Sequence, residues 1–217
     1  MEIAPFIDHT LLKPDATAID IQQICAEAIA YSFKAICIPP YYVQEAEKVL
    51  STEEHRPLIA TVIGFPMGYA STAAKVEEIK RAIDDGADEV DAVMNICAVK
   101  SKAWNYVRND IDSLITAAHL KGKKIKIILE TGLLTGEEID RLCAMALELK
   151  PDFVKTSTGF NGPGAQPETV QRILNRLEGK IAVKASGGIR DAQTARRYLE
   201  MGVKRIGASR SIAIVSE

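Results

Sequence analysis

Two lysines lie at the centres of short apolar stretches, where a charged side chain is costly to bury. Lys155 belongs to the stretch Phe153-Val-Lys-Thr-Ser-Thr-Gly-Phe160, and Lys184 belongs to Ile181-Ala-Val-Lys-Ala-Ser-Gly-Gly188. Each stretch has the composition of a β-strand that ends in small residues and glycine. Because the pattern occurs twice, we predict that these lysines take part in chemistry on an amine.

Side chains alternate along a strand, so both lysines can point the same way from adjacent strands about 5 Å apart. An ordinary lysine has a pKa of about 10.4, and making its neutral amine the main form near pH 7 costs about 4 kcal/mol. A second ammonium about 5 Å away supplies roughly 3 kcal/mol of this, and burial supplies the rest. We therefore predict one nucleophilic amine and one activating cation. The alternative is that each lysine forms an interior salt bridge or points outward.

Asp91 is the best candidate to complete this site. It lies in Glu89-Val-Asp-Ala-Val-Met-Asn95, where Asp91, Val93 and Asn95 share one face of a predicted strand. An inward carboxylate could hold the activating ammonium and move protons as a carbinolamine forms and collapses. The neighbouring Asp88 and Glu89 are expected in the loop and at the start of the strand. The alternative for Asp91 is a strand-end carboxylate that caps a loop.

Glycines and small hydroxyl residues follow the last two predicted strands. Gly187 and Gly188 form one pair, and the segment Gly207-Ala-Ser-Arg-Ser211 opens a short helix. Backbone N–H groups at such loops and at a helix N-terminus commonly bind phosphate in barrel proteins. We therefore predict a phosphorylated small molecule as the ligand, with Gly207 and Ser209 contributing to its site.

Strand-like runs rich in Ile and Val alternate with segments of helical apolar periodicity. The predicted strands are Ile3–Asp8, Lys34–Pro39, Ile59–Gly64, Glu89–Asn95, Lys124–Glu130, Asp152–Ser157, Ile181–Ser186 and Lys204–Ala208. The predicted helices are Thr17–Tyr31, Tyr41–Leu50, Thr72–Asp85, Asn105–Leu120, Glu137–Leu149, Pro167–Leu177, Ala192–Met201 and a short helix that begins near Ser211.

Eight such βα repeats predict a single-domain α/β protein, a (β/α)8 TIM barrel formed by residues 1–217. A doubly wound open sheet is the alternative, but its glycine-rich fingerprint is absent after every predicted strand. In a barrel the active site lies at the carboxyl ends of the strands. Both lysines, Asp91 and the glycine loops fall at or near those ends.

The composition excludes several classes of function. The formal charge of −2 gives no support for binding nucleic acid or a membrane surface. No run is long and apolar enough for a membrane span, and the N-terminal segment is too short and acidic for a signal peptide. The four cysteines lack metal-binding spacing and indicate a cytoplasmic protein with reduced thiols. The three histidines lie far apart, so we expect no metal site.

Several motifs, taken in order, resemble those of one family. They are Ile7-Asp-His-Thr-Leu-Leu12, Glu89-Val-Asp-Ala-Val-Met-Asn95, Val154-Lys-Thr-Ser-Thr-Gly159, Val183-Lys-Ala-Ser-Gly-Gly-Ile189 and Ile206-Gly-Ala-Ser209. The chain is similar over nearly its whole length to the 2-deoxyribose-5-phosphate aldolases, the DeoC-type class I aldolases. The resemblance implies a cytoplasmic barrel enzyme of deoxyribonucleotide catabolism that reversibly cleaves 2-deoxy-D-ribose 5-phosphate into D-glyceraldehyde 3-phosphate and acetaldehyde. It implies no metal and no other cofactor, and it favours a homodimer.

The resemblance also implies a role for individual residues. Lys155 is then the Schiff-base lysine, Lys184 the activating lysine and Asp91 the acid/base that relays protons with water. The resemblance places Asp8 and Thr10 near the substrate and matches Cys37 to a pocket cysteine, for which core packing is the favoured alternative. The other predicted substrate-binding residues are Thr158, Gly159, Gly187, Gly188, Gly207, Ser209 and Arg210. Some members carry a lysine where this chain has Phe160, and Arg210 is our candidate to replace it as a phosphate contact.

Three other functions remain possible for this sequence. A related Schiff-base lyase would act on a different aldol or a longer sugar phosphate, which a substrate panel would reveal. A non-catalytic phosphosugar-binding barrel would keep the glycine loops and two unreactive, protonated lysines. A metal-dependent isomerase or aldolase would lose activity with a chelator.

Overall fold

The computed structural model describes residues 2–216 as a closed barrel of eight parallel strands. The strands are β1 (Ile7–Thr10), β2 (Ala35–Ile38), β3 (Leu58–Ile63), β4 (Glu89–Val93), β5 (Lys124–Ile128), β6 (Phe153–Lys155), β7 (Ala182–Ser186) and β8 (Arg205–Ala208). They pair in sequence order, and β8 closes the barrel against β1. The predicted (β/α)8 barrel is therefore confirmed, and the open doubly wound sheet is wrong.

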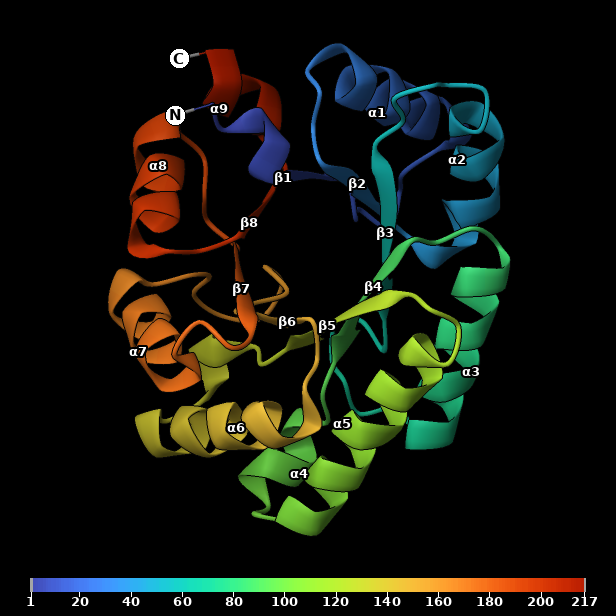
Figure 1. The fold of residues 1–217 in the computed structure, drawn as a ribbon. Helices are drawn as coiled ribbons and strands as arrows, with labels where there is room; N and C mark the ends of the chain where they lie inside the picture. The colour runs from blue at the N-terminus through green and yellow to red at the C-terminus, as the bar shows by residue number, and fades with distance from the viewer. Residues whose placement is uncertain (1, 217) are drawn as a thin grey trace.

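Helices surround the strands and follow one another around the barrel (Figure 1). The α-helices are α1 (Ala18–Ala30), α2 (Val43–Leu50), α3 (Thr72–Asp84), α4 (Ile96–Lys100), α5 (Trp104–His119), α6 (Gly136–Leu149), α7 (Pro167–Leu177), α8 (Ala192–Met201) and α9 (Ser211–Ser216). Short 3-10 helices are η1 (Ala4–Phe6), η2 (Pro40–Tyr42) and η3 (Thr131–Leu133).

Local capping explains where several helices begin. Thr135 and Glu138 form a capping box at the start of α6, and the Asp191 side chain accepts from the backbone N–H of Thr194 at the start of α8. These side chains satisfy backbone donors that have no partner within the helix. Gly202 ends α8 in the left-handed conformation that glycine adopts at little cost.

Several segments differ from the predicted elements. The predicted strands Lys124–Glu130 and Asp152–Ser157 end earlier, at Ile128 and Lys155. The first strand begins at Ile7 rather than Ile3, because Pro5 lies in the 3-10 helix η1, where its fixed φ and missing N–H are tolerated. Strand β4 ends at Val93 rather than Asn95, because the Asn95 side chain instead accepts from Ala98 N at 3.0 Å and caps α4. Helix α4 lies outside the predicted elements.

The main apolar core lies between the barrel and the helices, where outward-facing strand residues such as Ile36 and Ile59 pack. Inside the barrel, Ala35, Cys37, Ala60 and Val62 form a smaller apolar cluster. Val93, Ile96 and Ile128 form another small apolar cluster. Charged side chains occupy much of the remaining interior, and they belong to the candidate active site. Among residues 2–216, no helix has the length and apolar character needed to cross a bilayer.

Candidate active site

The strand register places the two lysines side by side. Lys155 on β6 is the pairing partner of Lys184 on β7. The carboxylate of Asp91, on β4, reaches both of them, because Oδ2 accepts from Lys155 Nζ at 2.8 Å and from Lys184 Nζ at 2.8 Å. Three residues that the sequence singles out for catalysis therefore meet at one oxygen atom, and both lysines are paired with a carboxylate.

These three residues belong to a set of seven buried charged side chains, which we call the interior ion cluster. Its members are Asp8, Glu89, Asp91, Lys126, Lys155, Lys184 and Arg205. The second carboxylate oxygen of Asp91 accepts from Lys126 Nζ at 2.7 Å. Lys126 also pairs with Glu89 at 2.6 Å. Asp91 is thus held by three ammonium groups on three different strands.

Asp8 and Arg205 extend the cluster to strands β1 and β8. Lys184 Nζ donates to Asp8 Oδ2, and Arg205 Nη1 donates to Asp8 Oδ1 at 2.6 Å. Arg205 also donates to both carboxylate oxygens of Glu89 at 3.0 and 3.1 Å. Because the buried charges are paired and hydrogen-bonded in this way, they avoid the desolvation free energy that an isolated buried charge would cost.

Neighbouring charges determine the ionisation of this cluster. Burial alone would raise the pKa of Asp8, but the surrounding lysines and arginine outweigh it and lower the pKa to about 2. Three lysines likewise outweigh burial and hold the pKa of Asp91 well below its usual range. Burial disfavours the ammonium of Lys184, yet Asp8 and Asp91 raise its pKa above the ordinary value. Lys184 therefore stays a cation at neutral pH.

Sequence reasoning missed three members of the cluster. Glu89 begins its strand, as expected, and its side chain is buried inside the barrel. Lys126 lies at the centre of β5, and Arg205 begins β8. The signal that could have identified them is alternation, since Glu89 precedes Asp91 by two positions and therefore shares its face.

A cavity of about 300 Å³ opens where β1, β6, β7 and β8 end. Predicted site residues that line it are Thr10, Lys155, Thr158, Gly159, Gly187, Gly188, Gly207 and Ser209. Lys155 is the member of the interior ion cluster that lines this cavity. The cavity therefore joins the predicted nucleophile to the predicted phosphate loops.

The other predicted site residues lie elsewhere. Asp8, Asp91 and Lys184 are buried in the interior ion cluster beneath the cavity wall. Cys37 packs in the small apolar cluster of the barrel interior, where burial raises the pKa of its thiol. Arg210 is exposed at the surface, and the described cavity wall does not include it.

Two cations that sequence reasoning did not select line the cavity. Lys13 lies in the loop after β1, and Arg190 follows the Gly187-Gly188 pair by two positions. Both side chains belong to βα loops, which form the active-site face of a barrel. Their positive charges complement an anionic ligand, so they are stronger candidates than Arg210 to contact a phosphate.

The loops that follow β6 and β7 touch backbone to backbone. Gly187 has a φ of 86°, and a Cβ at this position would lie 2.8 Å from Gly164 Cα. A Cβ on Gly164 would lie 2.1 Å from the carbonyl oxygen of Gly187. Glycine is required at both positions, because any side chain would separate the loops that follow β6 and β7.

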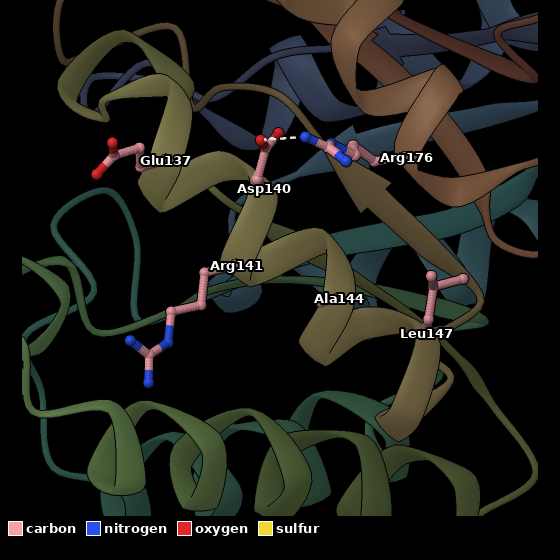
Figure 2. A pocket seen from close by; sticks show the side chains of 6 residues that line it. All are labelled: Glu137, Asp140, Arg141, Ala144, Leu147 and Arg176. Atoms are coloured by element: carbon pink, nitrogen blue, oxygen red, sulfur yellow. Dashed lines mark hydrogen bonds and ion pairs between the residues drawn. The ribbon is translucent and has the colours of Figure 1, made fainter.

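A second hollow of about 480 Å³ lies on the outer face of α6 (Figure 2). Asp140 there accepts from Arg172 and Arg176, and these charged groups are partly or largely exposed to solvent. The residues that line this hollow are Glu137, Asp140, Arg141, Ala144, Leu147 and Arg176. It includes no predicted site residue, so the cavity at the strand ends remains the candidate active site.

The histidines do not assemble into a site. His9 pairs with Glu27 at 2.7 Å, and His119 pairs with Asp152 at 3.0 Å on the outer layer. Within the part of the chain that the structure describes, no group of three His, Cys, Asp or Glu side chains is placed to hold a metal ion.

The fold and the site together define a TIM barrel whose candidate active site is built from lysine amines and a carboxylate. The family model of the DeoC/LacD family aldolases matches residues 3–213. The chain therefore belongs to the DeoC/LacD aldolase family, as the sequence motifs indicated.

Individual relatives support this membership. The chain is 47% identical over 216 residues to the deoxyribose-phosphate aldolase of Thermococcus gammatolerans, covering 99% of this chain and 96% of that protein. It is also 47% identical to the deoxyribose-phosphate aldolase of Finegoldia magna, covering 99% of each chain. Among solved structures, the aldolase QR15 is 36% identical with a TM-score of 0.93, covering 100% of this chain and 95% of that one. The tetrameric deoxyribose phosphate aldolase of Aeropyrum pernix is 31% identical with a TM-score of 0.90, covering 99% and 89%.

Proposed function

We propose that this chain reversibly cleaves 2-deoxy-D-ribose 5-phosphate into D-glyceraldehyde 3-phosphate and acetaldehyde through a Schiff base on Lys155, without a metal ion. The observation that carries this proposal is the contact of Lys155 and Lys184 with the same oxygen of Asp91, beside a cavity that only Lys155 of the three lines. The names of the close relatives support the substrate.

The reaction begins when the neutral amine of Lys155 adds to the aldehyde carbon of the open-chain sugar. The carbinolamine loses water and becomes a protonated imine, which withdraws electrons from the adjacent carbon. The C3 hydroxyl then loses its proton, the C2–C3 bond breaks, and its electron pair forms an enamine as glyceraldehyde 3-phosphate leaves. Protonation of the enamine at C2 and hydrolysis of the imine release acetaldehyde and the free lysine.

The interior ion cluster contains more cations than carboxylates. Three carboxylates face four cations when every member is ionised, which leaves one positive charge in excess. Lys126 occupies one oxygen of Asp91 and Lys184 shares the other, so Lys155 shares its carboxylate with two further cations.

The acid/base role falls to Asp91. Its carboxylate touches the reacting amine directly and is held rigidly by the two other lysines. We therefore infer that Asp91 exchanges protons with Lys155 and with water as the carbinolamine forms and collapses.

The phosphate group would lie at the glycine-rich loops. Gly187, Gly188 and Ser209 bring backbone N–H groups and a hydroxyl to one part of the cavity wall, and Lys13 and Arg190 add positive charge. This combination suits a phosphate, which accepts hydrogen bonds and carries negative charge. Thr10 and Thr158, which line the same cavity, are the proposed contacts to the sugar.

The proposal is tested by following glyceraldehyde 3-phosphate release from 2-deoxy-D-ribose 5-phosphate, with longer sugar phosphates as comparison substrates. We expect turnover that a chelator does not change and that falls by about 10³-fold or more in Lys155→Met. Activity that the chelator abolishes, or that Lys155→Met retains, would contradict the proposed mechanism. Turnover of the longer sugar phosphates alone would contradict the substrate.

We also propose that the protein is cytoplasmic and forms a homodimer. The four cysteines are free thiols, as is usual in a reducing compartment. Ile19, Tyr41 and Tyr69 are large exposed side chains that follow the consecutive strands β1, β2 and β3, and they form the candidate interface.

A further inference from the structure

Glu130, which follows β5, is a buried carboxylate with an unusual backbone. Its side chain is inaccessible to solvent, and its φ of 44° and ψ of 60° lie in the left-handed region. This conformation is uncommon for residues other than glycine. Backbone strain of this kind persists only where the surroundings hold it, often at functional sites. The contacts of Glu130 therefore indicate what the strain serves.

All three donors to the Glu130 carboxylate come from the loop that follows β6. Oε1 accepts from Thr158 N at 3.3 Å. Oε2 accepts from the Thr158 hydroxyl and from Asn161 Nδ2, the latter at 3.1 Å. Among residues 2–216, no lysine, arginine or histidine forms an ion pair with Glu130. Its charge is therefore compensated by this one loop, which it holds in place.

The same loop is held from its other side by the loop after β3. Asn161 Nδ2 also donates to the carbonyl oxygen of Pro66 at 3.2 Å. Phe160 packs edge-to-face against Phe65 with ring centroids 5.2 Å apart. The segment Thr158–Phe160 is thus fixed between Glu130 and the loop that carries Phe65 and Pro66.

This segment forms the cavity wall beside the nucleophile. Thr158, Gly159 and Phe160 all line the cavity, together with Lys155, the last residue of the preceding strand β6. The Thr158 hydroxyl donates a hydrogen bond to the Glu130 carboxylate and accepts one from Phe160 N at 3.1 Å. Its position and orientation are therefore determined by Glu130 before any substrate arrives.

We infer that Glu130 is a positioning residue, which fixes the Thr158–Phe160 wall in the conformation that receives the phosphorylated sugar. The inference rests on the proposed function, because it takes the phosphorylated sugar as the ligand of this cavity. It assigns Glu130 to substrate affinity and not to the chemistry at Lys155, since the interior ion cluster holds Lys155 independently of this loop.

Glu130→Gln tests this role with little change of shape, because one accepting oxygen becomes an NH₂ group that faces other donors. We expect KM for 2-deoxy-D-ribose 5-phosphate to rise about tenfold or more, with kcat changed less than about threefold. Borohydride trapping of acetaldehyde on Lys155 should proceed at the wild-type rate. The matched control is Glu137→Gln, an exposed carboxylate on α6 that should leave both constants unchanged.

A double-mutant cycle with Thr158→Val distinguishes positioning from general stability. If Glu130 acts through the Thr158 hydroxyl, the double variant should have a KM within about twofold of the more impaired single variant. If Glu130→Gln does not fold, Thr158→Val alone should still raise KM while trapping continues.

Three results would overturn the inference. The first is an unchanged KM in a folded Glu130→Gln protein, and the second is single-variant effects on KM that multiply in the double variant. A lower kcat at constant KM, with a lower melting temperature, would likewise show a merely structural role. Failure of wild type to trap acetaldehyde would instead contradict the proposed function itself.

Discussion

Lys184 donates to both Asp8 and Asp91, which keep it charged through neutral pH. In Lys184→Met, Asp91 Oδ2 would be left to Lys155 alone, and the reacting amine would be held as an ammonium. The repulsion between two ammonium groups about 5 Å apart is worth roughly 3 kcal/mol. We therefore predict that acetaldehyde trapping at pH 7 slows about 100-fold in this variant. The rate should recover as pH rises and the remaining lysine loses its proton.

The control for this prediction is Lys204→Met, which removes an exposed lysine from the segment before β8. It should trap acetaldehyde at the wild-type rate. Equal slowing of Lys184→Met at every pH would mean that Lys184 acts through structure and not through its charge.

Asp8 makes stability depend on pH in a defined direction. Its pKa falls from 3.8 to about 2 on folding. As the pH is lowered, the Asp8 carboxyl of the unfolded chain therefore binds a proton before that of the folded protein. The resulting stabilisation, about 2 kcal/mol, is fully present above pH 4 and disappears as pH falls toward 2. We predict that Asp8→Asn lowers the free energy of unfolding by about 3–5 kcal/mol at pH 7, since it removes one of the three buried carboxylates that offset four buried cations.

Urea unfolding of both proteins at pH 7 and pH 3 provides the measurement. The difference between wild type and Asp8→Asn should be smaller at pH 3 by about 1 kcal/mol. A difference that is equal at the two pH values would show that Asp8 is not ionised in the way the cluster requires.

At the scale of elements, a buried ion pair joins α3 to α5 and contacts the carboxyl end of β4. Lys75 on α3 donates to Asp110 on α5 at 2.7 Å and to the carbonyl oxygen of Val93 at 3.1 Å. Asp110 also accepts from Asn95 N at 3.1 Å. This pair holds α3, α5 and the carboxyl end of the strand that carries Asp91.

We predict that Lys75→Met lowers the free energy of unfolding by about 3–5 kcal/mol, because it leaves Asp110 buried without its cation. Lys80→Met, on the exposed side of the same helix, removes a solvent-exposed pair with Glu77 and should cost less than about 0.5 kcal/mol. Denaturant unfolding measures both values. Similar costs for the two variants would contradict the structural role of the Lys75–Asp110 pair.

The periodicity of the sequence was enough to predict most elements, because strands and helices alternate with clear apolar patterns. It failed at Pro5 and Asn95, where a proline and a capping side chain override strand propensity. Helix α4 was missed because a five-residue helix is too short for a periodic signal.

The site was only partly predictable. Alternation correctly indicated that Lys155 and Lys184 are adjacent, but sequence does not show which side chains meet across a closed barrel. Lys126 and Arg205 complete the interior ion cluster through contacts between strands far apart in the chain. Arg210 looked suitable by position in the sequence, yet its side chain is exposed and lies outside the cavity wall.

At the scale of the whole molecule, three large apolar side chains are exposed in neighbouring parts of the surface. Ile19 at the start of α1, Tyr41 in η2 and Tyr69 before α3 are 77%, 85% and 67% exposed. They follow β1, β2 and β3, which are consecutive in the barrel. We predict that this surface contributes to the homodimer interface, since large exposed apolar groups commonly mark association sites.

Sedimentation equilibrium tests this interface. Tyr41→Lys should raise the dimer dissociation constant at least tenfold, because it places a charge within an apolar contact. The control is Leu120→Lys, which changes an 82% exposed residue that follows α5, at the opposite end of the barrel. An unchanged dissociation constant in Tyr41→Lys would exclude this surface as the interface.

The most direct test of the proposed chemistry is borohydride trapping with acetaldehyde, followed by peptide mass mapping of wild type and Lys155→Met. We predict a reduced two-carbon adduct on the peptide that carries Lys155, and no adduct there in the variant, because Lys155 is the amine of the interior ion cluster that reaches the cavity. An adduct on Lys184 would reverse the two lysine roles. No adduct in wild type would contradict the Schiff-base mechanism.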